Sequence, residues 1–210
     1  MKNSVKHIVP VLIMMSIIFT MFGCQKNYTP KEEKYISEIE KERLEKDEYM
    51  RDDPNSPFNY KSKIEFHPLK YFDVDPAWVF TSKLYEYEVK DTVSIFGTKG
   101  EERKSVRYGN VSINYENQNI NMHVYQSAAP SGLIYYSIWF TDQTTNKETY
   151  GVGRYLDFEL VDDPEYEYTL DFNKAYNPYC AYSPEYSCAI PTKEDYINIP
   201  ITAGEKKFHD

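Results

Sequence analysis

The chain lacks the short motifs that mark most catalytic and cofactor sites in a sequence. Its 210 residues contain no H-E-x-x-H zinc motif, no G-x-S-x-G nucleophile motif, no C-x-x-C pair and no phosphate-binding P-loop. The G-x-G formed by Gly151 and Gly153 has Leu156 where a dinucleotide fingerprint needs a third glycine. We expect these glycines to let the chain bend into a strand, and we expect no cofactor.

An excess of basic residues is also missing. The formal net charge is −9. It becomes −11 if residues 1–23 are removed, because that segment carries Lys2 and Lys6 and no acid. Nucleic-acid phosphates would repel such a chain, so we exclude nucleic acid as a partner.

Cysteine is rare, and the first of the three follows a short apolar run at the N-terminus. Residues 8–22 are too few for an ordinary membrane span but suit the core of a signal peptide, and basic residues precede them. Met21-Phe22-Gly23-Cys24 resembles the lipobox of bacterial lipoproteins, in which the cysteine is lipidated and becomes the mature N-terminus. We predict a lipoprotein signal peptide over 1–23 and acylation of Cys24, for example by palmitate. The alternative is an uncleaved anchor helix.

Those acyl chains would hold the protein on a membrane, which places it in the cell envelope, facing the periplasm or the exterior. Thiols commonly oxidise there, so we predict a disulfide between Cys180 and Cys188. It would close a nine-residue loop and stabilise the fold by roughly 2.5 kcal/mol. Two free buried thiols, or a metal or redox role, are the alternatives.

The histidines of the mature chain are scattered, so no metal site is expected. They are His67, His123 and His209.

Residues 24–52 are predicted to form a tether and then a helix. Thr29 is a suitable N-cap, with Pro30 at the first helical position and Glu32 at the third. Few apolar side chains follow, in one narrow stripe: Tyr35, Ile36, Ile39 and Leu44. Most of the helix should therefore be solvated with this stripe on the domain; a partner-binding helix is the alternative.

Residues 53–210 are predicted to form a single β-rich domain, since the chain is long enough for one well-buried core. Alternating apolar and polar residues, separated by turn residues, indicate about eight short strands. The expected ranges are 78–89, 92–96, 106–114, 120–126, 133–141, 154–161, 166–173 and 197–202. This spacing favours a mainly β fold, an antiparallel barrel or sandwich with an N-terminal helix.

Two of these strands carry a paired pattern of apolar and acidic residues. Leu156 and Phe158 share one face of the first strand, and Leu170 and Phe172 share one face of the second. If the two strands pair directly with a common apolar face, one permitted register sets Asp157 opposite Asp171. Two close carboxylates would share a proton or hold a cation, which makes this pair the candidate catalytic residues.

Further polar residues gather at the ends of these strands. Arg154 falls on the apolar side by parity, and a buried arginine needs a partner. It either forms a salt bridge to an acid of the sheet (Asp171, Asp142 or Glu205) or binds a carboxylate or phosphate of a ligand. The candidate ligand-binding residues are Arg154, Asp171, Asn173, Tyr176 and Asn177.

The following loop is rich in tyrosine and proline. Its aromatic residues are Tyr176, Tyr179, Tyr182 and Tyr186. Rigid aromatic rings on a restrained loop are typical of surfaces that stack on sugars or other ligands. The alternative is that they cover the open end of the β domain.

Several of these segments together resemble a known family. The segments 149–157 (TYGVGRYLD), 170–182 (LDFNKAYNPYCAY) and 203–206 (AGEK) are similar to signatures of the bacterial and archaeal family called domain of unknown function 1684. The similarity extends from near Ser56 to the C-terminus. The resemblance implies family membership but no established activity.

Three functions remain open at this point. The first is a cell-envelope lipoprotein that acts as a binding or accessory module for a small polar or glycan-like ligand. The second is a hydrolase that uses Asp157 and Asp171, and the third is a structural component of the envelope. A shallow groove lined by tyrosines would favour the binding module.

Overall fold

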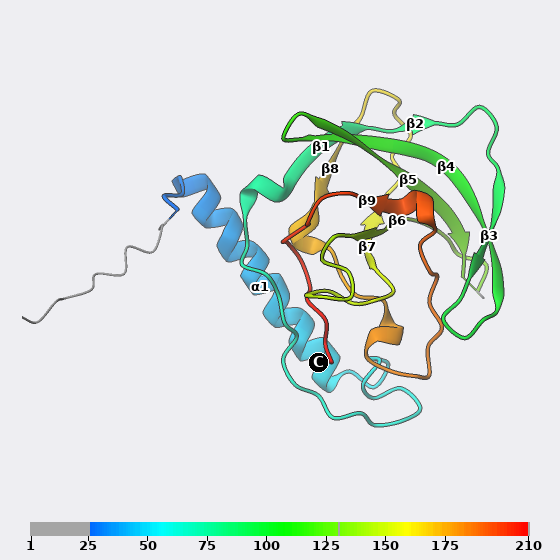
Figure 1. The fold of residues 1–210 in the computed structure, drawn as a ribbon. Coiled ribbons are helices and arrows are strands. Elements are labelled where there is room, and N and C mark those ends of the chain that lie inside the picture. Colours follow the sequence, from blue (N-terminus) through cyan, green and yellow to red (C-terminus); the bar gives the residue numbers. More distant parts are fainter. Residues whose placement is uncertain (1–25, 130, 210) are drawn as a thin grey trace, which may run out of the picture.

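The computed structural model describes residues 26–129 and 131–209. The predicted signal peptide and Cys24, the predicted lipidation site, lie outside the described residues. Helix α1 (Pro30–Asp52) begins as the sequence predicted, with Thr29 as N-cap and a reciprocal capping box to Glu32. Figure 1 shows α1 lying along one side of the strands, with the C-terminus near its end.

The buried stripe of α1 is narrow, as predicted, but its membership differs from the prediction. Ile39 and Met50 are its buried residues. Leu44, predicted to belong to the stripe, is 65% exposed. Met50 packs in a small, mostly aromatic cluster with Phe58 and Phe208. This cluster joins the helix to the first and the last residues of the β-rich domain.

The described part of the chain holds nine strands and four short 3₁₀ helices. The strands are β1 (Val79–Lys83), β2 (Tyr85–Glu86), β3 (Thr92–Phe96), β4 (Glu102–Tyr115), β5 (Gln118–Ala128), β6 (Ile134–Asp142), β7 (Arg154–Phe158), β8 (Glu167–Asp171) and β9 (Tyr196–Ile197). The 3₁₀ helices are η1 (Pro76–Trp78), η2 (Phe172–Lys174), η3 (Tyr179–Ala181) and η4 (Lys193–Asp195). The fold is mainly β, as predicted.

The strands form two sheets rather than one closed barrel. The larger has the order β2-β4-β5-β6-β7, with β3 on β4 and β9 on β6, and the smaller pairs β1 with β8. All of these pairs are antiparallel except β6 with β9. In the described residues, β7 and β8 are not hydrogen-bonded to each other, so the strands do not close into a barrel. The arrangement is closer to a sandwich of two sheets.

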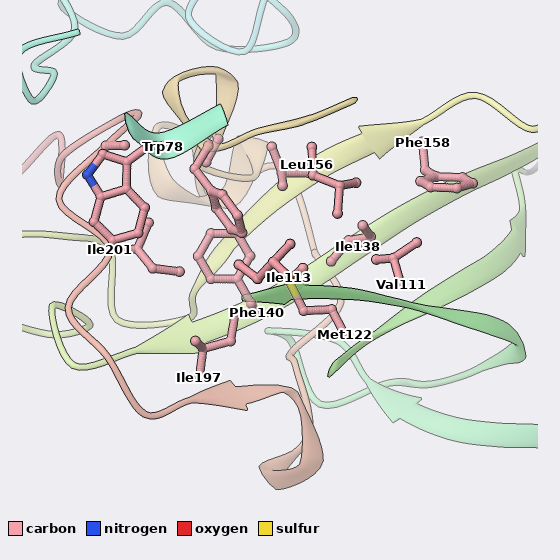
Figure 2. Packing of buried hydrophobic residues seen from close by; sticks show 14 of the residues in the cluster. Trp78, Val111, Ile113, Met122, Ile138, Phe140, Leu156, Phe158, Ile197 and Ile201 are labelled. Atoms are coloured by element: carbon pink, nitrogen blue, oxygen red, sulfur yellow. The ribbon is translucent and has the colours of Figure 1, made fainter. Parts of the chain in front are cut away.

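The main core lies between the apolar faces of these two sheets. Figure 2 shows its side chains converging, among them Ile113 from β4, Ile138 from β6 and Leu156 from β7. Residues of β8 and η2 enter the same core, because Leu170 and Phe172 are buried in it. The prediction that Leu156, Phe158, Leu170 and Phe172 point into one core is therefore confirmed, although their strands are not paired.

Two local predictions at the strand ends have clear outcomes. The strand expected over 197–202 is wrong for most of its length, because only Tyr196–Ile197 pairs and Pro200 has no N–H to donate to a ladder. Gly153 enters β7 with φ of +102°, and a Cβ there would lie 2.5 Å from the carbonyl oxygen of Phe140. Its position is one that only glycine fits well.

Candidate functional site

A cleft of about 470 Å³ lies on the outer face of strands β6 and β7. Its floor follows strand alternation, because every second residue of a strand points to the same side. Tyr135, Ser137 and Trp139 come from β6, and Tyr155 and Asp157 come from β7. These side chains face away from the core that Ile138 and Leu156 fill.

The walls of the cleft come from segments distant in sequence. One wall is the loop after β8, which supplies Tyr176, Pro178, Tyr179 and the segment 186–189. The other is the C-terminal part of α1, which supplies Lys46, Tyr49 and Met50. The loop is fixed on β7 by two backbone hydrogen bonds between Tyr155 and Tyr176, of 2.9 and 3.0 Å. The cleft is therefore built between the sheet, the tyrosine-rich loop and the N-terminal helix.

Two polar side chains at the floor of the cleft, Asp157 and Ser137, have few or no hydrogen-bond partners in the described residues. Asp157 is exposed, and its Oδ1 accepts a 2.6 Å hydrogen bond from the Tyr176 hydroxyl. Ser137 stands directly opposite Asp157 in the β6–β7 register. Ser137 is 3% exposed, and its hydroxyl has no hydrogen-bond partner among the described residues. A buried hydroxyl without a partner costs free energy, so Ser137 leaves one unsatisfied polar group beneath the floor of the cleft.

The aromatic rings of the cleft are packed at steep angles to one another. The centroids of Trp139 and Tyr155 are 5.9 Å apart, and those of Tyr155 and Tyr176 are 6.0 Å apart at 74°. Tyr179 meets Tyr186 at 5.2 Å and 79°. Burial raises the pKa of the hydroxyls of Tyr155, Tyr176 and Tyr179, so these stay protonated donors.

The cations at the rim of the cleft are both engaged in ion pairs. Lys46 Nζ lies 2.5 Å from Glu205 Oε1, and Arg103 lies 2.5 Å from Glu101 Oε1. A hydrogen bond from the side chain of Ser187 is the largest cause that lowers the pKa of Glu101 to about 2. Glu101 therefore stays a carboxylate over the whole neutral range.

Arg154 is placed away from the cleft, inside the protein. Its guanidinium donates a 2.8 Å hydrogen bond to Asp142 Oδ2, and it also bonds the carbonyl oxygens of Ile201 and Ala203. Both charged side chains are 1% exposed. Of the two interpretations offered by the sequence, the internal salt bridge is the one observed, and Asp142 is the partner among the three acids considered.

Asp171 and Asn173 also have internal partners, which attach α1 to the domain. Asp171 Oδ2 accepts a 2.8 Å hydrogen bond from the Tyr35 hydroxyl, and Asp171 Oδ1 accepts one from the backbone N–H of Asn173. The Asn173 amide donates to the same Tyr35 hydroxyl and to the carbonyl of Asp75. Asn177 is buried as well, and its amide donates to the carbonyl of Lys206.

The expected cross-strand pairing of Asp157 with Asp171 is wrong. In the observed register Asp157 faces Ser137 of β6, and Asp171 faces Val79 of β1. A side chain stabilises the connection between β7 and β8. The Tyr168 hydroxyl accepts a hydrogen bond from the N–H of Val161 and donates one to the carbonyl of the same residue. The two aspartates line one cavity of about 150 Å³ between the strands, but each bonds a different tyrosine.

Cys180 and Cys188 are neighbours in space, as the sequence predicted, and their thiols are free in this structure. The backbone N–H of Cys180 lies 3.2 Å from the sulfur of Cys188. A hydrogen bond from the Cys188 thiol lowers the pKa of Cys180 to about 7, and the same contact is the largest cause that raises the pKa of Cys188. The disulfide stays a prediction.

We expect alkylation of Cys180 by iodoacetamide in the reduced protein to rise with pH around a midpoint near 7. The reason is that the thiolate is the nucleophile and a lowered pKa forms it at lower pH. Cys188 should stay largely unmodified over the same range. Timed alkylation followed by peptide mass spectrometry measures both. Cys188→Ala should move the midpoint upward toward the ordinary thiol value; identical midpoints for both cysteines would contradict the assignment.

Only part of the site was foreseen from the sequence. Of the candidate residues, Asp157 and Tyr176 line the cleft on β6 and β7, together with Tyr179 and Tyr186 of the aromatic loop. Lys46, Ser137 and Trp139 were missed. The alternation of residues 134–142 could have placed Ser137 and Trp139 on the face opposite Ile138, but nothing local to Lys46 connects it to the strands.

In residues 26–129 and 131–209, no group of three or more histidine, cysteine, aspartate or glutamate side chains is placed to hold a metal ion. Over the same ranges, every helix is too short or too polar to cross a membrane.

The fold and the cleft define an antiparallel β protein with a docked N-terminal helix and a cleft lined by aromatic side chains. Its family is that described as Protein of unknown function (DUF1684), whose model matches residues 64–206, and the chain belongs to it. The fold is similar to the solution NMR structure of the uncharacterized protein from gene locus rrnAC0354 of Haloarcula marismortui, with 27% identity and a TM-score of 0.61. That match covers 84% of this chain and 96% of the other. No curated protein matches this chain.

Proposed function

We propose that this protein is a cell-envelope lipoprotein, anchored through acylated Cys24, whose cleft binds a small polar, glycan-like ligand. The lipobox-like end of the N-terminal apolar run supports the anchor. The docking of α1 supports a tethered arrangement, because Tyr35 and Lys46 attach the helix that follows Cys24 to the ligand-binding domain.

The composition of the cleft carries the proposal. Sugars present an apolar ring face and a rim of hydroxyls, so their sites combine aromatic side chains with a few placed polar groups. The cleft offers the rings of Trp139, Tyr155 and Tyr176 beside the unpartnered hydroxyl of Ser137 and the exposed carboxylate of Asp157. Its volume of about 470 Å³ falls in the range of small-molecule sites.

Native mass spectrometry of protein extracted from its host membranes tests both parts of the proposal. The mature protein should begin at an acylated Cys24 and should retain a small ligand after incubation with host small-molecule extract. Asp157→Ala should reduce the retained fraction at least several-fold, because it removes a polar anchor from the cleft floor.

Glu159→Ala is the matched control for that substitution. Glu159 is exposed and lies two residues further along the same chain segment, but it does not line the cleft. Its ligand occupancy should equal that of the unchanged protein. Equal loss in both variants would contradict the cleft as the binding site, and an unmodified Met1 would contradict the lipid anchor.

A further inference from the structure

The charges that line the cleft do not cancel. Three charged side chains take part in the lining: Lys46, Arg103 and Asp157. Lys46 is neutralised by Glu205, and Arg103 is neutralised by Glu101. Asp157 has no cationic partner in the described part of the chain, and it accepts a hydrogen bond from the hydroxyl of Tyr176. One negative charge is therefore left for a ligand to compensate.

The aromatic rings favour the same sign of ligand charge. The face of an aromatic ring is electronegative and attracts cations, most strongly ammonium groups. The cleft already contains one such contact, because Lys46 Nζ lies 5.0 Å from the centre of the Tyr176 ring. Trp139, Tyr155 and Tyr179 add further rings to the lining. An ammonium group that enters the cleft would lie beside these rings and the carboxylate of Asp157.

An anionic ligand fits the cleft less well. It would approach an exposed carboxylate that has no cation of its own, and like charges brought together out of water repel. To bind an anion, Lys46 would have to leave Glu205, which is 1% exposed and would then be a buried charge without its partner. A neutral ligand avoids repulsion but would cover Asp157 without compensating it.

We propose that the ligand of this cleft carries a positively charged nitrogen, held between the aromatic rings and the carboxylate of Asp157. This inference rests on the proposed function, because it names the chemical class of the ligand that the same cleft binds. It predicts that charge, and not only shape, decides affinity.

Choline and 3,3-dimethylbutan-1-ol are the probes that separate charge from shape, since the second replaces the quaternary nitrogen of the first by carbon. Binding to the full chain can be followed by calorimetry and by tryptophan fluorescence. Of the two tryptophans, Trp139 lines the cleft and Trp78 lies in the core, so Trp139 reports occupancy. Choline should bind about ten-fold or more tightly than the alcohol, as cation–π and ionic contacts require.

Asp157→Asn should weaken choline binding by about ten-fold and leave binding of the alcohol unchanged, because it removes charge and keeps shape. Glu159→Gln, which changes an exposed acid outside the cleft, should leave both affinities unchanged. A loss of the choline signal in Asp157→Asn with an unchanged unfolding curve would support a direct contact.

Other outcomes overturn the inference in distinguishable ways. Equal affinity for choline and the alcohol, or equal weakening by both substitutions, would show that charge is not selected. If choline does not bind but native mass spectrometry finds a neutral or anionic ligand in the cleft, the ammonium proposal fails and the proposed function stands. If choline does not bind and no ligand is retained, both fail.

Discussion

Asp142→Ala is expected to lower the free energy of unfolding by about 3–5 kcal/mol, because it leaves the buried guanidinium of Arg154 without its carboxylate. Burial lowers the pKa of Arg154, which shows that the surroundings disfavour its charged form, and Asp142 is the group that opposes this. The other oxygen of Asp142 accepts two 2.6 Å hydrogen bonds from the backbone and hydroxyl of Thr144. Urea denaturation at neutral pH measures the loss.

Glu165→Ala is the control for that experiment. Glu165 forms an ion pair with Lys83 on the surface, where its side chain is 77% exposed, so its removal should change stability by less than about 0.5 kcal/mol. Adding Arg154→Met to Asp142→Ala should recover part of the loss, since the unpaired charge is then removed. Equal losses in Asp142→Ala and Glu165→Ala would contradict the buried pair as a main stabilising contact.

Glu205→Ala is expected to cost about 2–4 kcal/mol and to loosen helix α1. Glu205 is 1% exposed, and its carboxylate joins three segments. It pairs with Lys46 of α1, accepts a 2.9 Å hydrogen bond from the backbone N–H of Asn177, and accepts another from the Tyr182 hydroxyl. Burial raises the pKa of Tyr182 well above its ordinary value, so that hydroxyl stays a donor and would lose its acceptor.

Urea denaturation and limited proteolysis measure the two effects of Glu205→Ala. Trypsin should cleave after Lys46 and Arg43 faster in the variant than in the unchanged protein, because α1 is then less firmly attached. Glu42→Ala is the matched control, since Glu42 also pairs with a residue of the domain, Lys174, but on the exposed surface. If both variants lose the same stability and are cleaved at the same rate, Glu205 is not the main attachment of the helix.

The candidate site shows where inference from the sequence stopped. Alternation along residues 154–161 puts Tyr155 and Asp157 on the face opposite Leu156, and both lie in the cleft floor. Parity also placed Arg154 on the core side, where it lies, but the sequence left three acids open as its partner and did not decide between a salt bridge and a ligand contact. Asp171 and Asn173 were expected at a ligand site because they are polar, and they bond Tyr35 of α1 instead.

What the sequence determined by itself is local in origin. Alternation of apolar and polar residues specifies a strand and its buried face, and Thr29 with Pro30 and Glu32 specifies the start of a helix, because these effects act between near neighbours. Tertiary structure decided which strand lies beside which, as β8 pairs with β1 and not with β7. It also brought Lys46, Ser137 and Tyr176 around one cleft. Such contacts join residues far apart in sequence, and they depend on how all the apolar faces pack at once, which no single stretch of the chain specifies.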